Sequence, residues 1–213
     1  MLDPNTMAGR LAACTACHGA QGKAGPDGYY PRIAGKPADY LYNQLINFRE
    51  GRRQYRPMQA LLENLSDEYL HQIATWFSDQ HPPYEQPLTS KATAAALERG
   101  RTLAMLGDPA RNVPACASCH GSALTGVKPA IPGLLGLPHD YISSQFGAWT
   151  NNLRRAATPD CMSDIAKRMT PEDISAVAAW LASQPPGTGT PASSLPAPLP
   201  TKCGSQATIQ GGM

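Results

Sequence analysis

The sequence has few large aromatic side chains, little net charge and no long apolar run. Phenylalanine occurs only 3 times among 213 residues, and the formal net charge is +2. So mild a charge gives no reason to expect nucleic acid or an anionic membrane surface as a partner. No apolar run reaches the roughly 20 residues of a membrane span, so we expect no transmembrane span, while peripheral membrane association stays open. No charged start followed by an apolar stretch is visible, so this chain shows no signal peptide.

The chain contains two copies of one unit. Residues 30–53 align with 131–154, and residues 58–80 align with 162–184. The order of the shared features is the same in both halves, which indicates a tandem duplication. The first alignment repeats Pro31, Gly35, Pro37, Asp39, Tyr40, Gln44 and Arg53 as Pro132, Gly136, Pro138, Asp140, Tyr141, Gln145 and Arg154. The second repeats Met58, Glu68, Ala74, Trp76 and Gln80 as Met162, Glu172, Ala178, Trp180 and Gln184.

The duplication sets the expected domain boundaries. We expect an N-terminal domain at 1–80 and a C-terminal domain at 93–184. Between them, residues 81–92 contain three prolines and read as a semi-rigid linker. Residues 185–213 are rich in Pro, Gly, Ser and Thr, so we expect a tail without regular structure.

Each unit has a helical pattern. After Ser66, apolar residues recur at the i, i+3, i+4 and i+7 positions of an amphipathic helix, and the segment after Thr170 repeats this stripe. Ser66 and Thr170 are suitable N-caps, and acidic residues follow in the first turn. No segment shows convincing alternation with a period of two, so we expect an all-α fold of two small helical bundles. Further helices are expected at 6–13, 38–48, 95–106 and 140–149.

Both units carry the pattern Cys-x-x-Cys-His, as "CTACH" at 14–18 and "CASCH" at 116–120. This pattern is the attachment signature of c-type haem, in which two thiols form thioethers and the adjacent histidine binds the iron. A large apolar cofactor would also fill cores that few aromatic residues fill. We therefore expect two covalently bound haems c, with thioethers from Cys14, Cys17, Cys116 and Cys119 and axial ligation by His18 and His120.

Two other uses of Cys-x-x-Cys fit less well. A structural zinc site needs four tetrahedral ligands, usually from two separated pairs, and a histidine directly after the second cysteine is poorly placed to join them. A thioredoxin-like dithiol is expected in a strand–helix context, which this sequence lacks.

Methionine is a common second axial ligand in electron-transfer cytochromes c. Met58 and Met162 occupy equivalent positions in the two copies, whereas Met169 aligns with Leu65 and reads as core. Met7 and Met105 precede the haem motifs and also read as core, because methionine is a common filler of cores. We therefore expect Met58 and Met162 to be the second ligands.

Other repeated residues are candidates for the haem surroundings. The backbone carbonyls near Pro31 and Pro132 could accept the Nδ1 proton of the ligand histidines and fix their tautomer. The tyrosines and tryptophans could equally be plain core, and the arginines could equally be solvated surface residues. The candidates are Pro31, Arg32, Tyr40, Arg53, Trp76, Pro132, Tyr141, Arg154 and Trp180, of which Arg32 alone has no counterpart in the other copy.

With these features the sequence resembles the di-haem cytochrome c4 family of bacterial periplasmic proteins, over roughly residues 5–184. The resemblance rests on the doubled Cys-x-x-Cys-His, on "YPRIAGKPADYLYNQLINFREGRR" and on the final helix after a methionine. It implies two tandem class I cytochrome c domains and a periplasmic location. It also implies electron transfer between a dehydrogenase or quinol-oxidising donor and a terminal oxidase or another acceptor. The partners would be redox proteins, and the chain itself would be a carrier rather than an enzyme.

An alternative is a di-haem enzyme, or a dedicated electron-transfer subunit of a dehydrogenase, for example one resembling thiosulfate dehydrogenase. Such dehydrogenases use a cysteine ligand at the active haem, and Cys161 lies next to Met162. Cys161 and Cys203 are left over after haem attachment. In an oxidising compartment such a pair is more often a disulfide than two thiols. A disulfide, two free thiols and iron ligation by Cys161 all stay open at this point.

The doubled motif predicts that two haems stay attached when the protein is denatured. The intact mass of protein matured in a periplasm should exceed that of the polypeptide by two haem groups. Extraction of the haem by acidified acetone, or a mass increase of one haem only, would contradict this prediction.

Overall fold

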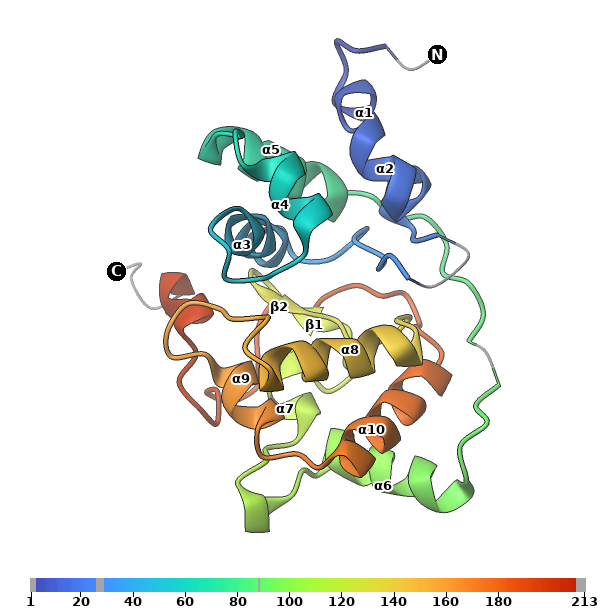
Figure 1. Cartoon of the computed structure of the whole chain (residues 1–213). Helices are drawn as coiled ribbons and strands as arrows, with labels where there is room; N and C mark the ends of the chain where they lie inside the picture. The colour runs from blue at the N-terminus through green and yellow to red at the C-terminus, as the bar shows by residue number, and fades with distance from the viewer. Residues whose placement is uncertain (1–2, 26–28, 88, 210–213) are drawn as a thin grey trace.

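The computed structural model describes residues 3–25, 29–87 and 89–209. They form a mostly helical fold, as the sequence predicts, with the first unit lying above the second in Figure 1. The linker runs down one side of the molecule and joins the last helix of the first unit to the first helix of the second. The two units therefore face each other, and each has its own apolar core.

The first unit is built around α3 and α5, which pack against each other. Its core contains Leu11, Leu41, Phe48, Leu62, Leu70, Ile73 and Phe77, all buried. The predicted helix over 6–13 is split at Leu11, and its second part continues through the haem motif. The elements are α1 (Met7–Arg10), α2 (Ala12–His18), the 3-10 helix η1 (Ala20–Gly22), α3 (Ala38–Arg49), α4 (Arg56–Leu62) and α5 (Asp67–Ser78).

The second unit repeats this plan, and here the first and last helices, α6 and α10, pack along each other. The contact is close, because a Cβ at Gly100 of α6 would fall 2.2 Å from the backbone oxygen of Ala176 in α10. The elements are α6 (Ala94–Met105), η2 (Pro109–Arg111), α7 (Cys116–His120), β1 (Gly126–Val127), β2 (Ile131–Pro132), α8 (His139–Thr150), α9 (Cys161–Ala166) and α10 (Pro171–Ser183).

The two predicted N-caps are present. The Ser66 hydroxyl accepts a hydrogen bond from the Tyr69 backbone N–H, and the Thr170 hydroxyl accepts one from the Asp173 N–H, each at 3.2 Å. Pro171 occupies the first turn of α10, where a missing N–H has no consequence. These caps set where the last helix of each unit begins. They therefore set how far Met58 and Met162 lie before that helix.

The short strands β1 and β2 were not predicted. They pair antiparallel, with Gly126 opposite Pro132 and Val127 opposite Ile131. Two residues are too few to show alternation in a sequence, so a period-two search cannot find such a pair. The pairing fixes Pro132 within the second unit, which bears on the site described below.

The insertion before the second haem motif is anchored by an ion-pair network. Asp108 and Asp173 are shared between Arg99 and Arg111, with Arg99 lying 2.7 Å from Asp173 and 2.9 Å from Asp108. Asp173 is only 6% exposed, and the hydrogen bonds from both arginines lower the pKa of its carboxyl. The network ties η2 to α6 and α10, so the inserted loop is part of the bundle.

The tail is more ordered than the sequence predicts. Ala192 forms a bridge to Val127 of β1, and Gly204–Ile209 forms a 3-10 helix, η3. Cys161 and Cys203 form a disulfide with a Cα–Cα distance of 5.1 Å. In Figure 1 the tail passes behind β1 and β2 and reaches α9, which places it along the cavity of the second unit. The composition of the tail predicts no regular structure because few of its residues are apolar. The bridge to β1 and the disulfide hold the tail instead.

Arg32 holds the linker. Its guanidinium donates to the backbone oxygens of Pro82 and Pro83 and lies 3.8 Å from the ring centre of Tyr84. Arg32 is 4% exposed. These contacts give Arg32 a role in fixing the linker, and the haem contact suggested by the sequence stays a prediction.

Within residues 3–25, 29–87 and 89–209, no helix combines the length and the apolar character needed to cross a membrane.

The disulfide predicts a loss of stability when Cys203 is replaced. It closes a loop of 42 residues, which the chain-entropy model values at about 4 kcal/mol. We expect Cys203→Ser to lower the free energy of unfolding in guanidinium chloride by up to this amount. A reducing agent should destabilise the parent protein in the same way and leave the variant unchanged. Alkylation of both cysteines without prior reduction would contradict the assignment.

Candidate haem sites

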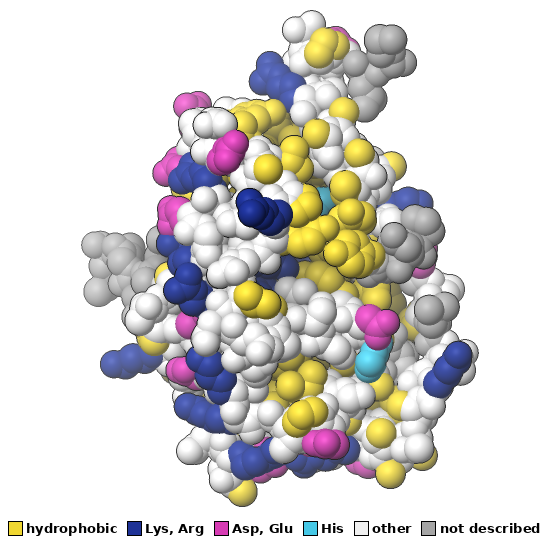
Figure 2. Space-filling model, viewed as in Figure 1, with side chains coloured by type: hydrophobic (Ala, Val, Ile, Leu, Met, Phe, Trp, Pro, Cys, Tyr) yellow, Lys and Arg dark blue, Asp and Glu magenta, His cyan; other side chains and the backbone are white. Residues whose placement is uncertain are grey.

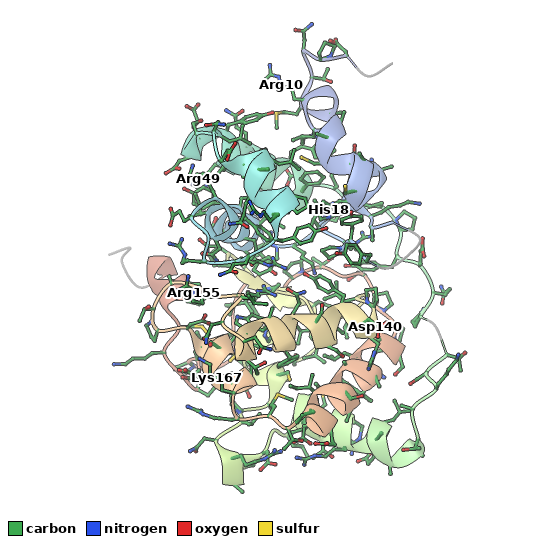
Figure 3. All side chains as sticks on the ribbon, in the orientation of Figure 1. Arg10, His18, Arg49, Asp140, Arg155 and Lys167 are labelled. Atoms are coloured by element: carbon green, nitrogen blue, oxygen red, sulfur yellow. A yellow bond between two sulfur atoms is a disulfide. The ribbon has the colours of Figure 1, made fainter. Side chains whose placement is uncertain are left out.

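Each haem motif lies on a short helix that points its three functional side chains to one side. In α7, Cys116 and Cys119 are three residues apart and His120 is four residues after Cys116, so all three share a face. The same spacing recurs in α2 with Cys14, Cys17 and His18. Figure 3 shows His18 at the end of α2 that points towards the second unit.

Both helices end at a glycine directly after the histidine. Gly19 has φ +73 and Gly121 has φ +83, conformations that residues with a side chain rarely adopt. A Cβ at Gly19 would lie 2.3 Å from the backbone oxygen of Ala24. The glycines thus let the chain turn sharply back towards the segment that contacts the histidine.

In both units the histidine donates its Nδ1 proton to a proline carbonyl. The Nδ1–oxygen distance is 2.9 Å from His18 to Pro31 and 2.8 Å from His120 to Pro132. These contacts are the ones predicted from the sequence. They leave the Nε2 lone pair of each ring free, which is the arrangement that a metal-binding imidazole needs.

Burial supports the same protonation state. Desolvation lowers the pKa of His18 and His120, so the neutral ring is favoured at neutral pH. Burial also raises the pKa of the Cys116 thiol to about 12, and it raises the pKa of Cys14. Both sites therefore present neutral, poorly solvated groups, as expected where an apolar cofactor is attached.

The second unit has a cavity of about 180 Å³ beside its haem motif. Cys116, Cys119 and His120 line it from α7, and Met162 lines it from α9, where the sequence predicts the second ligand. Met169 also lines this cavity, although it is 9% exposed and belongs to the core. Most of the remaining wall is apolar and includes Leu103, Val113, Ile142, Phe146, Trp149 and Val177.

In the first unit the predicted ligands border the core. Cys14 and Met58 both pack against it, from α2 and α4 respectively. Figure 2 shows hydrophobic side chains gathered on this face between the two helices, around a histidine. Tyr29, next to this region in sequence, is 61% exposed. The first site is therefore more open to the surface than the second.

Two repeated arginines form hydrogen bonds with the opposite unit. Arg53 donates to Tyr141 and Gln145 of the second unit, at 3.1 and 2.8 Å. Arg154 donates to Tyr40 and Gln44 of the first unit, at 3.3 and 3.0 Å. Each arginine also bonds the glutamine of its own unit. Equivalent residues thus meet about a pseudo-twofold axis.

The backbone joins the units at the same place. Gln54 N–H donates to the Leu153 oxygen at 2.7 Å, and Arg155 N–H donates to the Arg52 oxygen at 2.8 Å. The sequence suggested Tyr40, Tyr141, Arg53 and Arg154 as separate haem-side candidates. It did not predict that each arginine bonds the tyrosine of the opposite unit. Their recurrence with a glutamine at equal spacing was the signal that could have revealed it.

Two donors that line the cavity, Arg154 and Trp149, suit a cofactor that carries carboxylates. Arg154 is 6% exposed, stacks 4.1 Å from the Trp149 ring centre, and has no carboxylate partner in the described part of the chain. The Trp149 indole N–H is buried without a hydrogen-bond partner among those residues. Haem has two propionates, which would supply a negative charge for the Arg154 guanidinium and an acceptor for the Trp149 indole. Both Tyr40 and Tyr141 line the same cavity.

The repeated tryptophans lie elsewhere in the bundles. Trp76 packs edge-on against Phe77 at 4.9 Å, and Trp180 packs against the second core. Their backbone oxygens accept hydrogen bonds from Gln80 and Gln184, at 2.9 and 3.1 Å. The two tryptophan side chains pack against the cores of their units, and the haem contact suggested for them stays a prediction.

Comparison with known proteins identifies the class. Residues 97–185 match the family model described as cytochrome c. Residues 10–77 match the model for subunit III of cbb3-type cytochrome c oxidase. Together with two histidine-bearing attachment motifs, these matches define a c-type cytochrome with two cytochrome c units.

Full-length relatives identify the family. A thiosulfate dehydrogenase electron acceptor of Thiomonas intermedia is 39% identical over 82% of this chain and 79% of its own length. Cytochrome c4 of Pseudomonas aeruginosa is 30% identical over 81% of this chain and 84% of its own. The chain belongs to the di-haem cytochrome c4 family; it binds two haems c covalently and transfers electrons.

Solved structures agree with this assignment. Cytochrome c4 from Pseudomonas stutzeri matches with a TM-score of 0.69 and 27% identity, over 86% of this chain and 99% of that chain. Thiosulfate dehydrogenase from Marichromatium purpuratum matches with a TM-score of 0.72 and 32% identity, over 81% of this chain. This chain spans only 36% of that dehydrogenase.

The geometry predicts which methionines bind iron. We expect Met58→Ala and Met162→Ala each to abolish the sulfur-to-iron absorption band of one ferric haem and to let that haem bind carbon monoxide, because a thioether ligand is lost. The measurement is optical spectroscopy of the oxidised protein and of its reduced carbon monoxide complex.

Met169→Ala is the matched control, because Met169 lines the same cavity. It should keep both bands while losing about 2–5 kcal/mol of stability, as for other methionine truncations in a core. Met105→Ala, at a residue 36% exposed, should change neither property. Loss of the band in Met169→Ala would identify Met169, in the segment between α9 and α10, as the second ligand in place of Met162.

Proposed function

We propose that the chain is a periplasmic carrier that takes electrons from a dehydrogenase and delivers them to a terminal oxidase or another acceptor. The observation that supports this proposal is the repeated site, in which a histidine with a fixed tautomer recurs together with a methionine at an equivalent position of each unit. Bound haem supplies reversible one-electron exchange. His18 with Met58, and His120 with Met162, would fill both axial positions of each iron and leave no position for a substrate.

The disulfide supports a carrier over an enzyme. The enzymatic alternative depends on a thiolate from Cys161 as an iron ligand, and the sulfur of Cys161 is bonded to Cys203. Disulfides persist in oxidising compartments, which also agrees with a periplasmic location. Met162, directly after Cys161, lines the cavity and is the sulfur ligand that we propose for the second site.

A thiosulfate dehydrogenase is the donor that we favour. Relatives 39% and 34% identical to this chain, from Thiomonas intermedia and Stutzerimonas stutzeri, are named as electron acceptors of that enzyme. Quinol-oxidising donors, which the resemblance to cytochrome c4 also implies, are the second candidate. Whether the chain is a free shuttle or a dedicated subunit depends on how tightly it binds its donor.

Reduction kinetics test the donor and the carrier role together. We expect thiosulfate alone to leave the oxidised di-haem protein unchanged, and thiosulfate with a catalytic amount of thiosulfate dehydrogenase to reduce both haems. Dithionite serves as the control for full reduction. Absorbance in the visible haem bands measures the extent.

Each other outcome has a defined meaning. Reduction by thiosulfate alone would favour the enzymatic alternative. No reduction in the presence of an active dehydrogenase would exclude this donor and leave the quinol-oxidising donors to be tested next.

A further inference from the structure

We propose that Lys36, a residue of the first unit, acts across the interface and raises the reduction potential of the haem in the second unit. The inference rests on the proposed function in one respect, the ligation of that haem by His120. It adds a specific residue that gives two sites with the same ligands different reduction potentials.

Lys36 reaches into the second unit. It lies in the turn before α3, between Gly35 at φ +71 and Pro37, and its Nζ donates to the backbone oxygen of Gly133 at 3.2 Å. Gly133 directly follows Pro132, whose oxygen accepts the Nδ1 proton of His120. Lys36, Pro132 and His120 also line the same cavity. The ammonium group is therefore placed at the histidine side of the second site.

The charge of Lys36 is not neutralised nearby. Among the described residues, Lys36 makes no ion pair with a carboxylate. Burial lowers the pKa of Lys36 to about 8, which still leaves the ammonium form in excess at pH 7. A charge held in a poorly solvated place acts over a longer distance than one in water. The second site thus experiences a cation that salt screens only weakly.

The second unit has no lysine at the equivalent position that could act on the first unit. In the repeat alignment Gly35 matches Gly136, so the counterpart of Lys36 is Leu137. Leu137 packs against the second core and lines the second cavity. Arg53 and Arg154, by contrast, are exchanged symmetrically between the units. Lys36 is therefore a source of asymmetry at an interface that is otherwise repeated.

The sign of the effect follows from electrostatics. Reduction adds one electron to a site, and a nearby cation stabilises the reduced form more than the oxidised form. Lys36 thus raises the potential of the second site relative to the first. This contribution favours placing an electron in the second unit.

The experiment is a spectroelectrochemical titration of the complete di-haem protein with three substitutions. Lys36→Leu installs the residue of the other copy. Lys36→Gln removes the charge while keeping a donor for the Gly133 oxygen, and Lys36→Arg keeps the charge. Lys91→Leu is the control, because Lys91 lies exposed in the linker.

We expect Lys36→Leu and Lys36→Gln to lower one of the two potentials and to change electron sharing between the haems by roughly tenfold. A tenfold change corresponds to about 59 mV for a one-electron couple. Lys36→Arg and Lys91→Leu should stay close to the parent protein. The affected haem is identified by the NMR signals of the ligand methionines, assigned with Met58→Ala and Met162→Ala.

Several results would overturn the proposal. These are unchanged potentials in Lys36→Leu and Lys36→Gln, an equal shift of both haems, a shift of the first haem only, or a loss in Lys36→Arg as large as in Lys36→Leu. The last would mean that the shape of the side chain matters rather than its charge. None of these results depends on thiosulfate dehydrogenase, so failure of the proposed donor is detected separately.

Discussion

The hydrogen bond from each motif histidine to a proline carbonyl is the constraint on which both units depend. It fixes the ring orientation and tautomer, and so it determines on which side of α2 and α7 an iron can be bound. The chain must return from the helix end to the proline within 13 residues in the first unit and 12 in the second. The glycine after each histidine makes that return possible, and in the second unit β1 and β2 hold the proline in place.

The interface between the units follows from a second constraint, the cost of burying guanidinium groups. Burial lowers the pKa of Arg154, because the charged form loses its hydration. The tyrosine and glutamine of the opposite unit offset part of this loss with neutral acceptors. Neutral acceptors balance no charge, so these arginines favour an anionic group at the junction. Carboxylates of two cofactors placed face to face would satisfy this requirement from both sides.

Much of the fold could be predicted, because the repeat doubled the evidence for each element. The helices at 38–49 and 139–150 begin and end within one residue of the expected positions, and the two caps are those of Ser66 and Thr170. What was missed depends on contacts between distant segments. The bridge from Ala192 to Val127 pairs residues whose local sequence carries no mark of the partner, and the exchange of Arg53 and Arg154 is marked only by their recurrence at equal spacing from a glutamine.

Arg32 illustrates the same limit. Its charge and position suggested a haem contact, yet its partners are the carbonyls of the linker. A positive side chain near a cofactor motif has several acceptors within reach, and the sequence does not rank them. A linker rich in prolines, which lack an N–H, cannot form a regular backbone ladder, so its carbonyls are available to a nearby buried guanidinium.

The two copies differ mostly through additions to the second unit. The ion-pair network around Asp173, the disulfide of Cys161 and the tail on β1 belong to the second unit, and Lys36 reaches into it from the first. The disulfide and the tail line the second site and Lys36 places charge beside it, whereas the first site borders an exposed apolar face. Electrostatic effects grow as water is excluded, so equal ligands in unequal surroundings need not have equal potentials. A duplicated chain can acquire a preferred direction of electron transfer in this way, because the surroundings of one site change while the ligands of both stay the same.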